Sequence, residues 1–245
     1  VSYDRTPGRA SRLAARKAAA CAVAFDQSPL PRAELTGAPV RQAVLDVDRS
    51  NEERRAAARR LLGLEPERFV VAVMGGSLGS GVLNEAIAIY LDDHRDDGRL
   101  AVRQIAGERF SAGIEQVTGQ VQHQIVAYEQ DMAAVYTACD LVIGRGGAST
   151  VHEIAVTGTP AILVPWAAAA DDHQSDNVTW LSEVGGAVLL REDAIDQLGG
   201  AIETLRADDE RRAALGAAAS GRGAVHRSGA LAGLIERVAL TSTPS

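Results

Sequence analysis

The sequence has little cysteine and no long hydrophobic run. Its 245 residues include two cysteines, Cys21 and Cys139, which lie too far apart to suggest a disulfide framework or a paired-cysteine metal site. No apolar run reaches the roughly 18 residues of a membrane span. The start of the chain also lacks the charged, apolar and small-residue layout of a signal peptide. These absences favour a protein of the reducing cytosol.

The chain also lacks an excess of positive charge. Its formal net charge of -7 argues against a nucleic-acid partner. The hydrophobic fraction of 46% and the charged fraction of 23% are ordinary for a globular protein. The length allows one or two domains with a real core. Because the chain opens with Val1 rather than methionine, we expect a fragment of a longer protein.

From about residue 69 onward, short apolar runs alternate with stretches of helical periodicity. The expected strands are residues 69–74, 100–106, 124–128, 141–143, 161–164 and 187–190. The expected helices are residues 82–91, 110–117, 131–138, 150–157 and 173–184, with two or three more between 194 and 240. This alternation predicts an α/β fold, a Rossmann-like parallel sheet with helices on both faces.

The first 45 residues have a different pattern. A basic helix is expected at residues 7–20 and short strands at 21–25 and 34–36, as in the tail of a second α/β unit. Residues 37–39 would link this tail to the main sheet. The basic helix either touches an anionic membrane surface or is a solvated helix face, and the sequence leaves both open.

Two glycine-rich loops, residues 75–79 and 144–150, each lie between an expected strand and an expected helix. A parallel sheet places its ligand beyond the carboxyl ends of its strands. Helix N-termini offer unpaired N–H groups, and glycine lets a phosphate approach the backbone closely. Two such loops in one domain suit a diphosphate. Tight structural turns are the alternative for either loop alone.

The usual phosphate motifs do not fit these loops. Residues 75–81 lack the P-loop lysine, and neither loop has the glycine spacing of the dinucleotide fingerprint. Residues 75–79 do match G-x-S-x-G, the nucleophile elbow of α/β-hydrolases. That enzyme would need Ser77 as nucleophile, an acid such as Asp140, and a histidine such as His173 or His226.

Further candidate residues each have two interpretations. Glu153 either closes a capping box with Thr150 or accepts two ribose hydroxyls. Residues 171–176 either hold a metal through carboxylates and His173 or, as we favour, cap the next helix. In the second case His173, Gln174 and Asn177 would face the cleft and bind sugar hydroxyls. Arg41 either pairs with a phosphate or is an ordinary surface arginine.

Taken in order along the chain, the motifs resemble the MurG-type family of peptidoglycan N-acetylglucosaminyltransferases, which have the GT-B fold. The matching segments are Pro7-Gly8-Arg9-Ala10, Gly37-Ala38-Pro39-Val40-Arg41, Gly75-Gly76-Ser77-Leu78-Gly79 with Asn84, Asp131-Met132-Ala133, Arg145-Gly146-Gly147-Ala148-Ser149-Thr150 with Glu153, Pro160 to Pro165, and Asp172-His173-Gln174 with Asn177. The resemblance implies transfer of GlcNAc from UDP-GlcNAc to a lipid-linked muramoyl-pentapeptide, without a metal or cofactor.

The resemblance also implies roles for particular residues. Arg41 and Ser77 would contact the diphosphate, beside the backbone of Gly76, Gly79 and Gly147. Ala148, Ser149 and Thr150 would offer N–H or hydroxyl groups to phosphate and sugar. Glu153 would hold the ribose, and Gln174 with His173 would recognise the GlcNAc hydroxyls. The segment at Tyr128 and Glu129 would meet uracil through its backbone. No catalytic residue is assigned.

The chain departs from the family pattern at two residues and in its extent. Leu78 stands where the family often has glutamine, and Asp4 replaces a sugar-contacting asparagine. The expected domains are the tail of the amino-terminal acceptor domain at residues 1–38, the donor-binding domain at 39–225, and a C-terminal helix and tail at 226–245. The partners would then be the donor, the lipid-linked acceptor, and the rest of the amino-terminal domain or a separate subunit, as in split GT-B enzymes. That domain would place the protein peripherally at the cytoplasmic face of the membrane.

Overall fold

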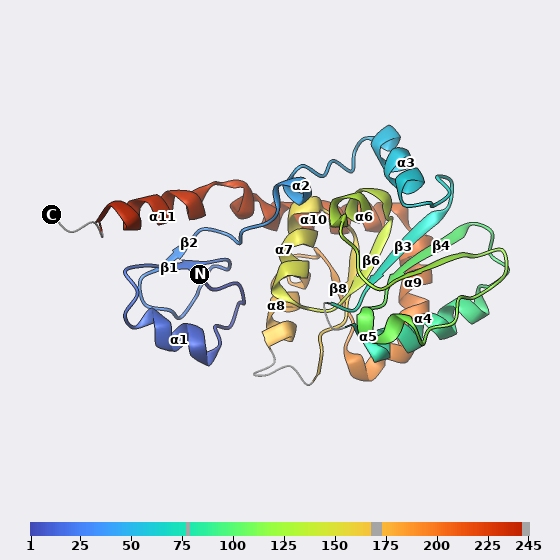
Figure 1. Cartoon of the computed structure of the whole chain (residues 1–245), viewed down its shortest axis with the longest axis horizontal. Coiled ribbons are helices and arrows are strands. Elements are labelled where there is room, and N and C mark those ends of the chain that lie inside the picture. The colour runs from blue at the N-terminus through green and yellow to red at the C-terminus, as the bar shows by residue number, and fades with distance from the viewer. Residues whose placement is uncertain (77–78, 168–172, 242–245) are drawn as a thin grey trace.

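The structure is a computed structural model that describes residues 1–76, 79–167 and 173–241 (Figure 1). Within them, a six-stranded parallel sheet has the order β5-β4-β3-β6-β7-β8. Its strands are β3 (Phe69–Met74), β4 (Leu100–Ile105), β5 (Gln122–Val126), β6 (Leu141–Gly144), β7 (Ala161–Leu163) and β8 (Val188–Leu189). Met74 pairs with Ile105 of β4 on one side and with Gly144 of β6 on the other. The predicted parallel α/β sheet is confirmed.

The two faces of the sheet are covered by different helices. Val70, Ala72 and Met74 of β3 join a cluster with helices α6 (Met132–Ala138), α7 (Ala148–Thr157) and α8 (His173–Ser182). The alternate residues Val71 and Val73 pack instead against α4 (Gly81–Asp93) and α9 (Leu198–Arg206). Because neighbouring strand residues point to opposite faces, a strand buried on both faces is apolar throughout. This explains the continuous apolar run of β3.

The remaining elements complete the domain and extend it at both ends. They are α2 (Gln42–Leu45), α3 (Glu52–Leu61), α5 (Glu108–Ser111), the 3-10 helices η2 (Glu192–Gln197) and η3 (Ala224–Arg227), α10 (Asp209–Gly223) and α11 (Ala230–Thr241). Helix α10 packs on α7. None of the helices in the described ranges is long and apolar enough to cross a bilayer.

The first 36 residues form a small unit beside the main sheet (Figure 1). It contains α1 (Arg9–Ala15) and two paired parallel strands, β1 (Cys21–Val23) and β2 (Ala33–Leu35), around a cluster of Ala15, Cys21, Val23 and Leu30. Helix α11 runs back from the main domain toward this unit, and Arg237 forms an ion pair with Glu34. Leu13, Ile235 and Leu240 are 67%, 58% and 79% exposed, so both ends present apolar surface.

The structure corrects several expected boundaries. The helix predicted at residues 110–117 is wrong beyond Ser111, because Gln116 and the Val117 N–H bond to His123 instead of continuing a helix. The basic helix is shorter than residues 7–20, and β5 begins at Gln122 rather than 124. Helices α2 and α3 were not predicted. In α3, Asn51 caps the N-terminus by accepting from the Arg54 N–H.

Candidate functional site

Both glycine-rich loops follow neighbouring strands at the carboxyl edge of the sheet. Strands β3 and β6 pair in parallel, and Met74 and Gly144 are opposite each other in the register. From β3 the chain continues through β4 to β5 at one edge, whereas from β6 it continues through β7 to β8 at the other. The two loops therefore meet where the strand order reverses. Open α/β sheets bind their ligands at this position.

The glycines of these loops serve two purposes. A Cβ on Gly79 would lie 2.3 Å from the Ala106 carbonyl oxygen, and one on Gly146 would lie 2.6 Å from the Gln174 carbonyl oxygen. Packing alone therefore requires glycine at these two positions. By contrast, no described atom outside the adjoining residues lies within 4 Å of a Cβ on Gly76 or Gly147. Their backbone is open to a ligand, so the structural-turn interpretation accounts for only part of each loop.

Helix α7 begins two residues earlier than predicted. Its N-cap is Gly147, which has no side chain to cap the helix, and Thr150 lies in the first turn. The capping box of Thr150 and Glu153 is therefore wrong, because Thr150 is not at the N-cap position. The first N–H groups of α7 have no partner within the helix, as at any helix start. Ala148, Ser149 and Thr150 carry these N–H groups, directly after the second glycine-rich loop.

Glu153 is held by two side chains from outside its own helix. The Tyr136 hydroxyl donates to its Oε2 at 2.8 Å, and Arg41 Nη2 lies 3.2 Å from its Oε1. Tyr136 is fully buried, and burial together with the Glu153 charge raises the pKa of its hydroxyl well above the ordinary value. The Arg41 side chain is 54% exposed, whereas that of Glu153 is 16% exposed. The carboxylate thus has one buried partner, Tyr136, and one exposed partner, Arg41.

A pocket of about 250 Å³ opens beside this carboxylate. Its lining residues are Tyr3, Ala38, Pro39, Val40, Arg41, Ser149, His152 and Glu153. It joins the linker that precedes α2 to the first turns of α7. The structure therefore brings together Arg41, Ser149 and Glu153, three of the residues predicted from sequence.

The start of α8 supports the second glycine loop. The Asn177 side chain donates to the Gly146 carbonyl oxygen at 3.3 Å and to Asp4 Oδ1 at 2.9 Å, and it accepts from the Arg5 N–H at 2.9 Å. Asn177 is fully buried, so its amide connects the amino-terminal segment to this loop and does not face an open cleft. Gln174 accepts from the Trp166 N–H at 3.0 Å.

Other predicted residues lie at the rim or outside the described ranges. Tyr128 follows β5 and is 65% exposed, and the Glu129 carboxylate accepts from Arg103 Nη2 at 2.6 Å. Arg103 therefore engages the Glu129 side chain, and contact of this segment's backbone with uracil stays a prediction. Ser77, Leu78, Asp171 and Asp172 are not among the described residues. Their roles, including helix capping and metal binding by the aspartates, stay predictions.

The hydrolase interpretation loses its proposed acid. Asp140 precedes β6 and accepts from the Val70 N–H at 2.7 Å, near the start of β3. Ser77 follows the end of β3, and Val70 and Met74 alone are separated by about 13 Å along the strand. His226 is also committed elsewhere, because its Nδ1 accepts from the Ala38 N–H at 2.9 Å. Asp140 therefore lies at the opposite end of β3 from the strand end that precedes residues 75–79.

Sequence reasoning missed the groups that support Glu153. Tyr136 lies within an ordinary apolar helix, and nothing in its spacing marks a hydroxyl aimed at α7. His152, one residue before Glu153, is buried, and its Nε2 bonds to the Tyr3 carbonyl oxygen at 3.0 Å. Both contacts join segments that are distant in sequence. A single sequence gives no signal that would have found them.

Comparisons with known proteins agree with this geometry. The chain is 37% identical over 223 residues to a UDP-N-acetylglucosamine--N-acetylmuramyl-(pentapeptide) pyrophosphoryl-undecaprenol N-acetylglucosamine transferase from Nocardioides sp.. It is 36% identical over 214 residues to the protein of that name from Salinibacter ruber. These matches cover 89% and 86% of this chain but 60% and 56% of the relatives, so the chain spans little more than half of their length.

Among solved structures, the fold is similar to that of MurG from Acinetobacter baumannii. The TM-score is 0.68 at 21% sequence identity, with 96% of this chain and 64% of that chain covered. The C-terminal CMP-Kdo binding domain of WaaA from the same species matches with a TM-score of 0.52 at 14% identity, covering 74% of this chain and 98% of that domain. The model of the glycosyltransferase family 28 C-terminal domain matches residues 70–228. The chain therefore belongs to the glycosyltransferase family 28 C-terminal domain family.

Proposed function

We propose that the chain is the donor-binding half of an enzyme that transfers GlcNAc from UDP-GlcNAc to a lipid-linked muramoyl-pentapeptide. The observation that carries the proposal is the meeting of the two glycine-rich loops at the β3–β6 switch point, with Glu153 one turn into α7. The relatives named above are transferases of this donor and this acceptor. The chain spans only part of their length, so the activity of the whole enzyme is inferred.

The donor diphosphate would lie between the two loops. The open backbone at Gly76 and Gly147 lets it approach closely, and the N-terminus of α7 offers N–H groups and a partial positive charge. Ser149 and Thr150 add hydroxyl donors. Hydrogen bonds from these N–H and hydroxyl groups can thus stabilise the diphosphate without a metal.

Glu153 would accept hydrogen bonds from the two ribose hydroxyls. Its Oε1 faces Arg41 across a solvated ion pair, and such a pair contributes little stability. Ribose can therefore displace Arg41 from Glu153 at small cost. The released guanidinium then lies next to the pocket and can pair with a phosphate of the same ligand. Tyr136 keeps Oε2 in place during this exchange.

The acceptor, its base and membrane contact belong in this proposal to another part of the protein. Residues 1–38 would be the end of an amino-terminal domain that binds the lipid-linked acceptor at the cytoplasmic face of the membrane. A separate subunit with this role, as in split GT-B enzymes, is the alternative arrangement. In either case the apolar surface at Leu13, Ile235 and Leu240 would contact that missing part.

Isothermal titration calorimetry with UDP and UDP-GlcNAc, in the presence and absence of EDTA, tests donor binding. We expect UDP and UDP-GlcNAc both to bind, and we expect EDTA to leave the affinity for each ligand unchanged. No UDP binding at millimolar concentration, or complete loss of binding in EDTA, would overturn the proposal. A fluorophosphonate probe checks the hydrolase alternative, because stoichiometric labelling of Ser77 would require a nucleophile there.

A further inference from the structure

A larger cleft lies at the amino ends of the strands, on the side of the sheet opposite the carboxyl ends that carry the proposed donor site. It has a volume of about 1000 Å³ and lies between the segment at residues 47–55, the end of α7 and one side of α10. Asp140 and Pro160, which precede β6 and β7, form part of its wall. Its lining includes four arginines, which are Arg49, Arg55, Arg212 and Arg227.

Two of these arginines lack an acidic partner. Arg49 donates to the Tyr136 carbonyl oxygen, and Arg227 donates to the carbonyl oxygens of Leu45 and Val156. Among the residues that the structure describes, neither has a carboxylate within ion-pair distance. Burial lowers the pKa of Arg49, which reflects the cost of removing this charge from water. Arg227 is exposed and Arg49 is half-buried, so both guanidinium groups can meet an anion that enters the cleft.

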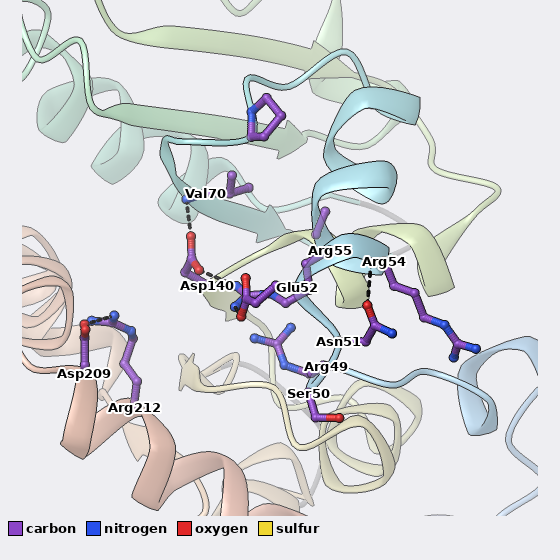
Figure 2. A network of polar contacts seen from close by, with 12 residues as sticks. Arg49, Ser50, Asn51, Glu52, Arg54, Arg55, Val70, Asp140, Asp209 and Arg212 are labelled. Atoms are coloured by element: carbon purple, nitrogen blue, oxygen red, sulfur yellow. Dashed lines mark hydrogen bonds and ion pairs between the residues drawn. The ribbon is translucent and has the colours of Figure 1, made fainter.

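The aspartates of the cleft are already engaged. Asp140 accepts from both Arg55 and Arg59, and Asp209 pairs with Arg212. Asp48 accepts from the Ser50 N–H and hydroxyl and lies 3.7 Å from Arg54. Figure 2 shows Arg212 and Asp209 on α10, across from Arg49 and Arg55. Asp140 pairs with Arg55 and Arg59, and Glu52 also pairs with Arg55, so among the described residues no carboxylate lies within ion-pair distance of Arg49 or Arg227.

We propose that this cleft binds a phosphate-bearing anion through Arg49 and Arg227. A guanidinium has five N–H donors in a planar fork that matches the oxygens of a phosphate. Both arginines use only part of this capacity on carbonyl oxygens. The hydroxyl of Ser220 lines the same cleft and supplies a neutral donor.

The proposed anion site is separate from the donor site. Asp140 and Gly144 lie at opposite ends of β6, so the two sites are about 13 Å apart along this strand. Substitutions in one site can therefore be used to distinguish ligand binding there from binding in the other site. Arg41→Gln alters the donor pocket alone, and Arg227→Gln alters the cleft alone. Arg60→Gln, on the exposed surface of α3 outside the cleft, is the control for the loss of one positive charge.

The test is calorimetric titration of inorganic pyrophosphate at low ionic strength into the wild-type chain and these variants. Binding in the cleft should persist in Arg41→Gln and Arg60→Gln and weaken about tenfold in Arg227→Gln. Because Arg49 is half-buried and bonds to the Tyr136 carbonyl oxygen, Arg49→Lys replaces deletion there, and far-UV circular dichroism verifies its fold. It keeps the charge but loses the fork, so weaker binding is again expected.

A second arm identifies the source of the phosphate. Vesicles of phosphatidylglycerol, compared with phosphatidylcholine, are tested for co-sedimentation with the same variants. Arg227-dependent binding to the anionic vesicles, with pyrophosphate inactive, would support the site and assign it to a lipid headgroup. Failure of both probes, or binding that Arg227→Gln and Arg49→Lys leave unchanged, would overturn the proposal. Pyrophosphate binding lost only in Arg41→Gln would assign it to the donor pocket and also overturn it.

Discussion

The Tyr136 hydroxyl lies 2.8 Å from Glu153 Oε2 and joins α6 to the first turns of α7. Tyr136 is fully buried, so no water can replace its hydroxyl without a rearrangement. This contact fixes a carboxylate that otherwise faces only the exposed Arg41. A pocket built in this way has a preorganised acceptor before any ligand binds. Preorganisation lowers the cost of ordering a side chain on binding.

Tyr136→Phe should weaken UDP binding by about tenfold, the effect of losing one hydrogen bond to a charged group. The ring remains, so the core stays filled. Calorimetry measures the affinity, and thermal melting measures the fold. Tyr90→Phe is a matched control, because the Tyr90 hydroxyl donates to Glu203 at 2.6 Å on the opposite face of the sheet. Equal losses of UDP affinity in both variants would contradict a positioning role for Tyr136.

Glu153→Gln should weaken UDP binding more than it lowers the melting temperature. The amide keeps the shape of the side chain but loses its charge, and charge-assisted bonds to two ribose hydroxyls are worth roughly 1.5–3 kcal/mol each. Glu203→Gln, again at the Tyr90 contact, makes the same chemical change away from the pocket. If Glu153→Gln lowers the melting temperature but leaves the UDP affinity unchanged, Glu153 has a structural role only.

Stability should fall in acid because three histidines are buried in neutral form, including His123, whose pKa is lowered to about 4 by burial. Burial, together with the nearby His152, lowers the pKa of His226 to about 3, and burial lowers the pKa of His152. The unfolded chain, with histidine pKa near 6.5, then binds more protons than the folded chain between about pH 3 and 6.5. The stability contributed by the neutral histidines is therefore fully present above about pH 6.5. The free energy of unfolding decreases as the pH falls through this window.

Thermal melting between pH 7 and pH 5 measures this loss. His226→Asn keeps an acceptor for the Ala38 N–H and removes the titrating ring, so its melting temperature should depend less on pH. His94→Asn is the control, because His94 lies on the opposite face of the sheet beside Glu203. An unchanged pH dependence in His226→Asn would show that the acid loss arises from other groups, such as His123 or carboxylates.

Local sequence signals predicted the sheet because its strands are continuous apolar runs, as in β3, and its helices follow at regular intervals. They placed both loops at the strand ends, since glycine and hydroxyl residues mark such turns. They failed where contacts between distant segments decide the conformation. Residues 112–117 have helical periodicity, yet the Val117 N–H donates to the side chain of His123 in β5 instead of to a helix carbonyl. Similarly, Asn177 was expected in the cleft, but Asp4 and Arg5 engage its amide.

The last prediction concerns transfer itself. The acceptor hydroxyl, a base and the donor carbon must be held together, and positioning alone supplies about 7–11 kcal/mol of the barrier. The described residues include the pocket proposed for the donor, but the chain spans only 60% and 56% of the two transferases compared above. The 245-residue chain should therefore bind UDP-GlcNAc and transfer GlcNAc no faster than background. Adding an amino-terminal domain of the same family, fused or in trans, should restore transfer to the lipid-linked acceptor. The measurement is incorporation of radiolabelled GlcNAc into lipid, with the Glu153→Gln chain as the control that restoration requires this donor pocket. Rapid turnover by the chain alone would mean that its acceptor site lies within these residues.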